Sequence, residues 1–544
     1  MGRLTKRLTR GPTQRLPAGV RSRLTLPRLL TAALLIAGVL ALAATLRGGG
    51  ADHAPADHAA RLAPADAVLY LHLKADRGSR QWKRGADLLG RVPALERIRD
   101  RFLRALTRRG GALDLEREVY PWLGDEAALA LMPDRGRTAR SLFLLEVSDS
   151  ALARSFLSRS VGREVISSYR GTTVSTYGRL ATAFVGGFLA IGQPAHVRSV
   201  IDASAGRTPS LAGQEAFRRA RARLPDRDRL LLAYASSAGL RRVLEPRPAL
   251  EGRAARLFDD PALDGVAASV RAERHGARID VSSALSQAGL GAAAAETFQP
   301  RLPGSIAGDA LAYVGMRGAD RILDAIRSFA GPAIELPRPL RELGQGLVSA
   351  GGLATLRRLR PLLQEEAALF VSRSAAVPVI TVVVDDVDRQ ESDQVLALLP
   401  PLLERLSGGA SGAGQVATLR PLRVAGVNAV SLRLSPALEL TYAVFGGRAV
   451  LATSPGGIAR VKQSRSKLTD NSLFAPGLRG RLGRVTSVVF LDLEQLLALG
   501  EQAGLGGAPG FEQLRSDLSP VRALSAVTHG GPASKTAEIF IEVP

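Results

Sequence analysis

The chain has 544 residues, of which 46% are apolar, and it contains no cysteine. This length exceeds one ordinary hydrophobic core and predicts two or more domains, while the missing thiols exclude disulfides, thiolate metal ligands and a cysteine nucleophile. The formal net charge of +23 includes +9 from residues 1–50, which carry nine Arg or Lys and no acid. The remaining positive charge is not accompanied by a zinc-finger, basic-zipper or RNP pattern, so we expect no nucleic-acid partner.

The N-terminal region has the pattern of a membrane anchor. Eighteen uncharged residues, Leu29 to Leu46, lie between Arg28 and Arg47, and as a helix they would span about 27 Å, close to the hydrocarbon core of a bilayer. Residues 1–28 are basic and contain no acid, which predicts a cytoplasmic arm. We therefore expect residues 29–46 to be a transmembrane signal anchor that crosses the lipid bilayer of the cell membrane once and leaves the bulk of the chain extracytoplasmic. The alternative is a cleaved signal peptide, because Ala41–Ala44 offers an Ala-x-Ala cleavage pattern.

Residues 47–63 are rich in Gly, Ala and Pro, which is typical of a flexible linker. Within them a repeated pentad brings together Asp52, His53, Asp57 and His58. Aspartate and histidine are ligands of divalent metals, but ordering a mobile linker around an ion costs conformational entropy. We therefore predict no metal in this linker.

Two long stretches of the chain resemble each other. GDEAALAL (124–131) and QEEAALFV (364–371) share Ala-Ala-Leu, and further segment pairs occur in the same order. Collinear matches of this kind predict an internal duplication, with a first repeat domain at 64–288, a linker at 289–302 and a second repeat domain at 303–544. The further pairs are 65–73 with 308–316, 143–157 with 381–396, 183–202 with 443–462, 215–220 with 472–477, 230–244 with 487–500 and 269–285 with 525–543.

Each copy alternates short strands with helices. Gly186-Gly187 and Gly446-Gly447 lie between two apolar runs and predict hairpin turns. SDSALARSFLSR (148–159) begins with a Ser/Asp cap and continues with Leu152, Ala153, Phe156 and Leu157 on one helical face. Because consecutive hairpins favour antiparallel strands, the fold class we predict is α+β. It comprises two tandem, diverged copies of a mainly antiparallel sheet with helices packed on one face, after one N-terminal transmembrane helix.

Motifs of several well-known enzyme classes are missing from the sequence. None of the six histidines has the spacing of His-Glu-x-x-His, and Gly-x-Ser-x-Gly does not occur. We expect His72 on a strand, and the corresponding residue of the second copy is Gly315. Ser464 to Lys467 fits Ser-x-x-Lys, but the partner motifs Ser-Asp-Asn and Lys-Thr-Gly are absent. We therefore predict no catalytic residue, no metal and no cofactor, although a triad assembled in space from distant segments stays open.

Two groups of residues are candidates for ligand binding. The only two tryptophans both lie in the first copy, where they line a groove or pack in a core or an interface. Four arginines follow one another along a predicted helix, where they meet anionic lipid headgroups or envelope polymers, or form a solvated helix face. These candidates are Trp82 and Trp122 in the first group and Arg218, Arg219, Arg221 and Arg223 in the second.

The motifs Gln81-Trp82 and Pro121-Trp122-Leu123-Gly124 follow the apolar N-terminal segment and PADAVLYLHL (64–73). In this combination the chain resembles an uncharacterised, mostly actinobacterial domain-of-unknown-function family of membrane-anchored proteins. The resemblance runs through most of the chain beyond the linker and is closer in the first copy, since the second has neither tryptophan. It implies a cell-envelope setting and brings no reaction, ligand or catalytic residue.

From these observations we expect a single-pass, membrane-anchored extracytoplasmic protein that binds or scaffolds a component of the cell envelope without catalysis. One alternative is a carrier of lipid or another hydrophobic ligand, which requires a dry apolar pocket between the sheet and its helices. A second is an envelope hydrolase, which requires a Ser/His/carboxylate or His/carboxylate cluster in a cleft.

Overall fold

The computed structural model describes most of the chain beyond residue 56. The described ranges are 57–91, 115–133, 139–160, 164–237, 263–285, 296–318, 364–374, 378–385, 419–435, 438–502, 504–507, 511–530 and 535–544. The predicted cytoplasmic arm (1–28), the predicted anchor (29–46) and residues 47–56 of the predicted linker lie outside these ranges. No helix within them is both long and apolar enough to cross a membrane.

The described strands of the first half, residues 57–285, pair in the spatial order β4-β5-β6-β7-β3-β2-β1-β8-β9-β10, and every pairing is antiparallel. Consecutive hairpins alternate with longer connections, which bring β7 beside β3 and β8 beside β1. The strands are β1 (Leu69–Lys74), β2 (Leu123–Pro133), β3 (Ala139–Val147), β4 (Val165–Tyr169), β5 (Thr172–Tyr177), β6 (Leu180–Val185), β7 (Phe188–Gly192), β8 (Leu231–Ser236), β9 (Leu263–Glu273) and β10 (Gly276–Leu285).

The described strands of the second half, residues 296–544, pair in the order β14-β15-β16-β17-β13-β12-β11-β18-β19-β20, again antiparallel throughout. Position by position, this order is the same as in the first half. The strands are β11 (Ala310–Arg317), β12 (Glu366–Ser372), β13 (Val379–Val384), β14 (Leu419–Val424), β15 (Val427–Ser435), β16 (Leu438–Phe445), β17 (Arg448–Ala452), β18 (Ser487–Asp492), β19 (Ala523–Gly530) and β20 (Lys535–Glu542).

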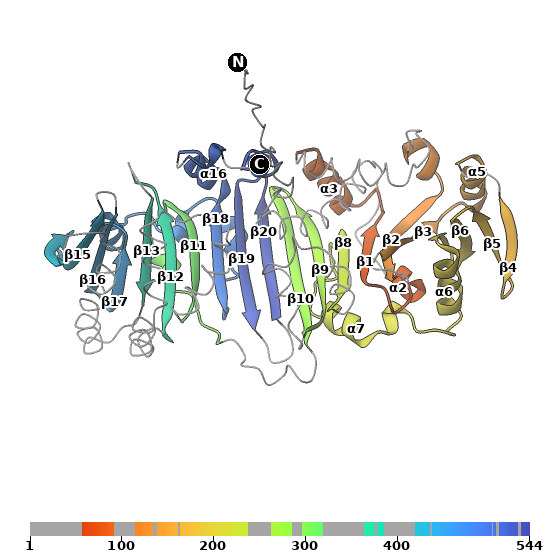
Figure 1. The fold of residues 1–544 in the computed structure, drawn as a ribbon, viewed down its shortest axis with the longest axis horizontal. Coiled ribbons are helices and arrows are strands. Elements are labelled where there is room, and N and C mark those ends of the chain that lie inside the picture. Colours follow the sequence, from red (N-terminus) through yellow and green to blue (C-terminus); the bar gives the residue numbers. More distant parts are fainter. Residues whose placement is uncertain are drawn as a thin grey trace, which may run out of the picture.

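The two halves share one 20-stranded sheet, which Figure 1 shows as a single curved surface. Strand β10 pairs with β20, from Gly276 opposite Glu542 to Ser282 opposite Thr536. Each half thereby covers an edge strand of the other, whose backbone N–H and C=O groups would otherwise lack partners. The two halves of the described chain are thus joined through the sheet itself.

Helices pack on both faces of the sheet in the first half. Leu71 and Leu73 of β1 pack in one core with Trp82, whereas Tyr70 of the same strand packs in another core with Phe217. A strand with apolar side chains on both faces needs cover on both, which is why the expected single layer of helices is wrong here. The helices are α2 (Ala59–Leu62), α3 (Arg80–Arg91), α5 (Ser150–Ser160), α6 (Pro194–Ser204), α7 (Glu215–Arg221), α14 (Pro455–Gln463), α15 (Phe474–Leu478), α16 (Leu493–Gln502) and α17 (Phe511–Leu518), with short turns η1 (Leu115–Val119), η2 (Leu211–Gly213), η5 (Leu302–Gly304), η7 (Leu468–Asp470) and η8 (Leu505–Gly507).

The two predicted Gly-Gly turns are present. Gly186 and Gly187 join β6 to β7 with φ angles of 57° and 84°, and Gly446 and Gly447 join β16 to β17 with 58° and 71°. Two consecutive positive φ angles match the right-handed twist of a two-residue hairpin, and glycine adopts them without steric cost. The α+β class with a mainly antiparallel sheet is therefore confirmed.

Candidate functional site

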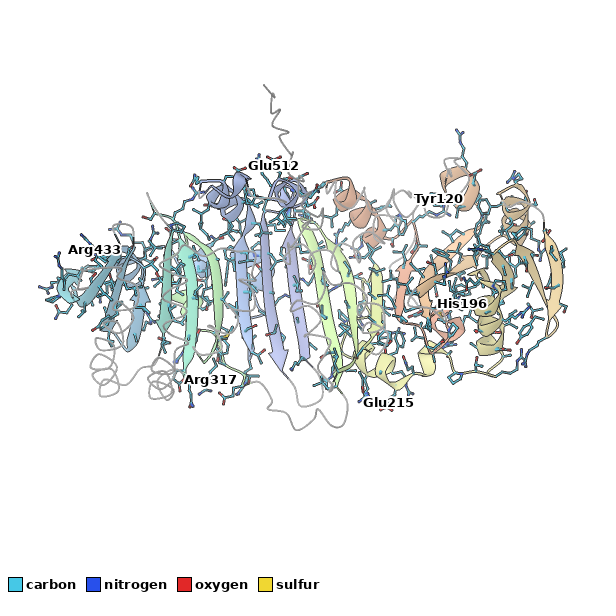
Figure 2. All side chains as sticks on the ribbon, viewed as in Figure 1. Tyr120, His196, Glu215, Arg317, Arg433 and Glu512 are labelled. Atoms are coloured by element: carbon cyan, nitrogen blue, oxygen red, sulfur yellow. The ribbon has the colours of Figure 1, made fainter. Side chains whose placement is uncertain are left out.

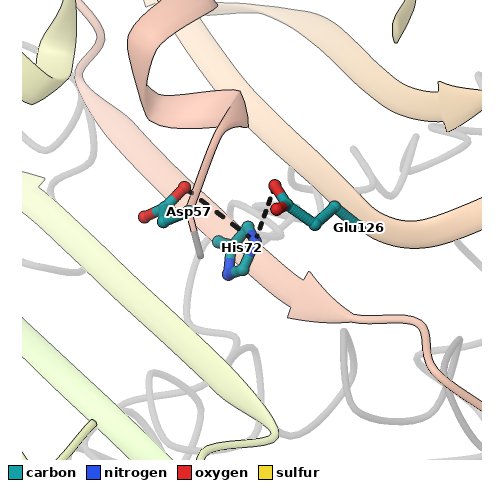
Figure 3. Close-up of side chains that lie close together, drawn as sticks. All are labelled: Asp57, His72 and Glu126. Atoms are coloured by element: carbon teal, nitrogen blue, oxygen red, sulfur yellow. Dashed lines mark hydrogen bonds and ion pairs between the residues drawn. The ribbon is translucent and has the colours of Figure 1, made fainter. Parts of the chain in front are cut away.

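Three ionisable side chains meet inside the first half of the sheet (Figure 3). Asp57 directly precedes His58 and helix α2, His72 lies on β1, and Glu126 lies on β2. In the antiparallel pairing His72 is opposite Ala128, so His72 and Glu126, which comes two residues before Ala128 on β2, share one face of the sheet. All three residues are buried.

Glu126 holds the first turn of α2 against the sheet. Its Oε2 accepts the backbone N–H of His58 at 3.0 Å and that of Ala59 at 3.2 Å. Its Oε1 lies 2.7 Å from Nδ1 of His58, whose side chain is 53% exposed. The first N–H groups of a helix have no partner within the helix. Glu126 therefore acts as an N-terminal cap that a neighbouring strand supplies.

Asp57 links the same turn to β1 and α7. Its Oδ1 accepts a hydrogen bond from the backbone N–H of Ala60 at 3.1 Å and another from the hydroxyl of Tyr70 at 2.6 Å. Its Oδ2 accepts no hydrogen bond from the described residues and lies 3.7 Å from Nη1 of Arg221. Since the side chain has no exposed surface, protein groups rather than bulk water must stabilise its charge.

The imidazole of His72 lies between the two carboxylates. Its Nε2 is 3.4 Å from Oε2 of Glu126 and 3.9 Å from Oδ1 of Asp57. Tyr70, two residues earlier on the same strand, stacks on this ring with an interplanar angle of 15°. Both Nε2–oxygen distances exceed the roughly 2.7–2.9 Å of a charge-assisted N–H···O bond. The hydrogen bond between Nε2 and Glu126 is therefore long, and Asp57 lies beyond hydrogen-bond distance of Nε2.

Burial and these contacts shift two pKa values in the cluster. Burial alone would raise the pKa of Glu126, but the hydrogen bond and charge of His72, with the backbone N–H of Ala59, lower it below its usual value. Burial and the neighbouring carboxylate of Asp57 raise the pKa of Tyr70 well above its usual range. Glu126 is therefore a carboxylate and Tyr70 a neutral hydroxyl donor at neutral pH.

The second half has a capping carboxylate at the matching position. Glu366 is opposite Arg317, the last residue of β11, just as Glu126 is opposite Lys74, the last residue of β1. The Glu366 carboxylate accepts the N–H of Arg301 at 2.8 Å and that of Leu302, the first residue of η5, at 2.9 Å.

The histidine has no counterpart in the second half. Counted from the last residue of β11, Tyr313 matches Tyr70 and Gly315 matches His72. A Cβ atom on Gly315 would lie only 2.3 Å from the Tyr313 hydroxyl, so the tyrosine occupies the space that a side chain would need. Burial raises the pKa of Glu366, and the nearby Asp385 raises it further.

A cleft of about 390 Å³ opens beside Glu366. Its lining combines three arginines, two glutamates, two other polar residues and one phenylalanine. Arg317, labelled in Figure 2, lies at the end of β11 and forms ion pairs with Glu365 and Glu296. The lining residues are Thr297, Phe298, Gln299, Arg301, Arg317, Glu365, Glu366 and Arg484. This balance of charges gives the cleft a polar wall without a strong excess of either sign.

Comparison with known proteins identifies a family. The family described as "Protein of unknown function (DUF3352)" matches residues 29–541. The chain belongs to this family. The resemblance to a domain-of-unknown-function family is thereby confirmed at the level of the family itself.

Other comparisons add little to the DUF3352 assignment. No protein of curated function matches this chain. Crystal form III of TP0453 aligns at 12% identity over 43% of this chain and 82% of that chain, with a TM-score of 0.27. Crystal form I of the same protein aligns at 12% identity over 43% of this chain and 81% of that chain, with a TM-score of 0.26. At these TM-scores the likeness carries no argument about fold or function.

The two tryptophans of this DUF3352 protein, both candidates for ligand binding, lie in the hydrophobic core. Trp82 and Trp122 are each 1% exposed and belong to the same core on the α3 face of the sheet. The indole Nε1 of Trp122 donates to the carbonyl of Glu118 at 2.7 Å, and its ring packs at 5.5 Å from Phe156. Core packing, weighed above as one alternative, therefore describes both residues.

The four arginines proposed as ligand-binding candidates differ in their contacts and exposure. Arg219 donates to Asp264 at 2.7 Å and to the carbonyl of Leu285 at 2.9 Å, and Arg221 is within 3.7 Å of Asp57. Arg218 and Arg223 are exposed. Half of this basic stretch thus holds α7 against the sheet and Asp57, and the other half faces solvent.

Two residues of the predicted linker, Asp57 and His58, belong to the folded body, which the sequence analysis did not predict. They lie beside His72 and Glu126 in the structure. Their hydrogen-bond partners are 13 to 68 positions away in the sequence, so the composition of the linker gave no sign of these contacts. Residues Ala59–Leu62 form α2 and are packed against α6 and η2. The Ser-x-x-Lys match brings no chemistry, since Nζ of Lys467 donates to the backbone carbonyl of Ser464 and not to its hydroxyl.

Proposed function

We propose that this DUF3352 protein is a single-pass, membrane-tethered extracytoplasmic protein that binds or scaffolds a component of the cell envelope without catalysing a reaction. The observation that carries the proposal is the attachment of residues 57–62 to the sheet through Asp57 and Glu126. Only ten residues, 47–56, separate this attachment from the proposed anchor, and fully extended they reach at most about 35 Å. A body attached in this way stays close to the bilayer surface.

The burial of the cluster supports a non-enzymatic role. A general base or nucleophile must come within hydrogen-bond reach of its substrate, whereas His72 is 1% exposed and Asp57 has no exposed side-chain surface. The contacts that these residues make run to α2, β1, β2 and α7, all parts of the same body. Such contacts favour a structural joint over a reaction centre.

The arginines of α7 support anionic lipid headgroups or envelope polymers as the partner. Arg221 contacts Asp57, the first described residue, so α7 lies beside the point where the proposed tether reaches the body. Arg218 and Arg223 are exposed on the same stretch, and arginine near an anionic surface is attracted to it. The exposed arginines therefore lie within three residues of one that contacts the start of the described body.

The alternative of a hydrophobic-ligand carrier receives less support. Such a carrier needs an enclosed apolar pocket, but the cleft beside Glu366 is lined mainly by charged and polar side chains. The hydrolase alternative has its His/carboxylate cluster, yet in the interior rather than in a cleft. We retain both as outcomes that the experiments can reveal.

We also infer that the two halves are diverged copies of one ancestral unit, in a family of mostly actinobacterial envelope proteins. The identical strand order, the capping carboxylates and two aromatic clusters support this inference. In one cluster Phe217 packs edge-on between Tyr70 and Tyr234, and in the other Phe474 packs edge-on between Tyr313 and Phe490. Edge-to-face packing at matching positions of both halves has no local cause and fits common descent.

The topology can be tested with alkaline phosphatase, which is active only outside the cytoplasm. Fusions after residue 28 and after residue 60 are assayed in intact cells. We expect an inactive enzyme after residue 28 and an active one after residue 60, and an inactive fusion at residue 60 contradicts the proposal. Crosslinking of the full chain in its native membrane then identifies what it binds, and recovery of a covalent substrate intermediate would favour the hydrolase instead.

A further inference from the structure

The buried cluster of the first half has the composition of a metal site. Asp57, His72 and Glu126 each offer one ligand atom, and these three atoms lie within 4.8 Å of one another. The three residues come from the segment before α2, from β1 and from β2, so the site forms only when the body is folded. Imidazole nitrogen with carboxylate oxygen is a donor set that Zn²⁺ and other divalent transition metals accept.

The distances suit a shared cation better than direct hydrogen bonding. With metal–ligand bonds of roughly 2.0–2.2 Å, neighbouring ligand atoms lie about 3.0–3.5 Å apart. Nε2 of His72 lies 3.4 Å from Glu126 and 3.9 Å from Asp57, near that range and too long for the charge-assisted bonds that adjacent groups achieve. Tyr70 to Asp57 at 2.6 Å and His58 to Glu126 at 2.7 Å show that short contacts form in the same cluster.

Both carboxylates are oriented by outer hydrogen bonds. Tyr70 donates to Asp57, while the backbone of His58 and Ala59 donates to Glu126. Partners of this kind fix the position of metal ligands and raise metal affinity. Oδ1 is the oxygen of Asp57 that faces His72, whereas Oδ2, which accepts no hydrogen bond from the described residues, faces Arg221.

Charge also favours a cation between these groups. Two buried carboxylates repel each other and lose hydration, and a divalent ion compensates both effects at once. Arg221, at 3.7 Å from Oδ2 of Asp57 and partly exposed, supplies one positive charge from the outer side of the cluster. The competing arrangement is a metal-free ion network in which His72 and Arg221 together balance the two acids.

We infer that Asp57, His72 and Glu126 bind one divalent transition-metal ion, Zn²⁺ by preference, which holds the start of the folded body to strands β1 and β2. The second half provides an internal comparison, because it keeps the capping Glu366 but has Gly315 in place of the histidine. A metal would therefore bind in the first half and not at the matching position of the second. This structural role of the ion is independent of the proposed envelope function.

The test uses the full chain purified in detergent through a tag without histidine. Its metal content is measured, the ion is removed with a chelator, and the protein is titrated with Zn²⁺, Mn²⁺ and Co²⁺ while the thermal midpoint is recorded. We expect about one Zn²⁺ per chain and a midpoint that rises with Zn²⁺, because a ligand that binds only the folded state stabilises it. Hydrogen exchange of residues 57–63 should slow when Zn²⁺ returns.

Two substitutions distinguish this site from adventitious binding. His72→Gln keeps size and polarity but removes the imidazole, so we expect Zn²⁺ affinity to fall by more than the roughly tenfold that loss of a supporting group costs. Glu366→Gln, the matched control in the second half, should leave affinity unchanged. If His72→Gln does not fold, Asp57→Asn gives the same comparison.

Three results overturn the inference. One is a folded wild-type chain that binds none of the three ions stoichiometrically and shows no change in thermal midpoint, which establishes the metal-free ion network. A second is Zn²⁺ binding of equal affinity in wild type and in the folded first-half variant, which places the ion elsewhere, for example on Asp52 and His53. Loss of binding in Glu366→Gln as well as in His72→Gln counts against the assignment in the same way.

Discussion

Glu126 and Glu366 occupy matching positions in the two halves of the sheet, and each caps a short helix, yet their pKa values shift in opposite directions. Glu126 interacts with the imidazole of His72, which lowers its pKa despite burial. Glu366 has Gly315 at the corresponding place, and burial together with Asp385 raises its pKa. One position in the fold thus carries a stabilised carboxylate in one half and a destabilised carboxylate in the other.

Glu126→Gln should lower stability at neutral pH and matter less in acid. A carboxylate whose folded pKa lies below the usual 4.5 stabilises the folded state above pH 4.5, and this contribution disappears as the pH falls through the folded pKa. We expect a loss on the order of 1–3 kcal/mol at pH 7, which shrinks below pH 4.5. Chemical unfolding of wild type and variant from pH 3.5 to 7.5, with a chelator present, measures the difference.

Glu366→Gln should show the opposite pH dependence. Since the folded pKa of Glu366 lies above the usual 4.5, its contribution is favourable below that value and is lost as the pH rises through the folded pKa. Glutamine keeps an oxygen to accept the N–H groups of Arg301 and Leu302. The variant should therefore gain stability relative to wild type between pH 4 and pH 7. Parallel curves for the two glutamine variants would contradict both assignments.

Removal of one hydroxyl should distinguish the two buried tyrosines. Tyr70→Phe removes the donor to Asp57 and leaves a buried carboxylate short of one hydrogen bond, so we expect a loss of about 1–3 kcal/mol. The hydroxyl of Tyr313 is buried without a hydrogen-bond partner among the described residues, and Tyr313→Phe should be neutral or stabilising. Thermal unfolding of the two single variants makes the comparison, and equal losses would count against the role given to Asp57.

Several elements could be predicted from the sequence because their causes are local. The Gly-Gly pairs form the expected hairpin turns. Asp149 caps α5 by accepting the N–H groups of Ala151 at 2.8 Å and Leu152 at 3.0 Å. Leu152, however, is 43% exposed, although its spacing places it on the apolar face of that helix. Residue spacing shows which side chains share a helix face but not how much of that face a neighbour covers.

The buried cluster could not be predicted because strand register is not local. GDEAALAL and QEEAALFV each carry a glutamate directly before Ala-Ala-Leu, and that shared letter was the available signal for Glu126 and Glu366. Their role depends on partners far along the chain, since His58 is 68 positions from Glu126. The Gly, Ala and Pro residues around Asp57 likewise predict a flexible linker. Composition alone does not show that Asp57 has a partner on a distant strand.

The two exposed arginines of the α7 region should attract this face of the body to an anionic bilayer. The chain has no cysteine, so a single cysteine at Glu215, the first residue of α7 (Figure 2), carries a fluorophore without side reactions. In nanodiscs with an acceptor-labelled lipid, energy transfer should be higher with phosphatidylglycerol than with neutral lipid. Each arginine near an anionic surface contributes on the order of 1 kcal/mol, so Arg218→Ala/Arg223→Ala should abolish most of the difference.

A matched control separates this local attraction from a change in net charge. Arg420 and Arg423 are also exposed, and they lie on β14, the edge strand of the second half, whereas α7 packs on β8, β9 and β10 near the middle of the described sheet. Arg420→Ala/Arg423→Ala removes the same charge far from the proposed tether and should preserve the dependence on phosphatidylglycerol. High salt should erase that dependence in wild type, because exposed charges are screened within a few ångströms at 1 M. Equal energy transfer from both lipids in the wild-type chain would exclude anionic headgroups as the partner of α7. If the β14 variant lowers the transfer as much as the α7 variant does, the attraction depends on net charge alone.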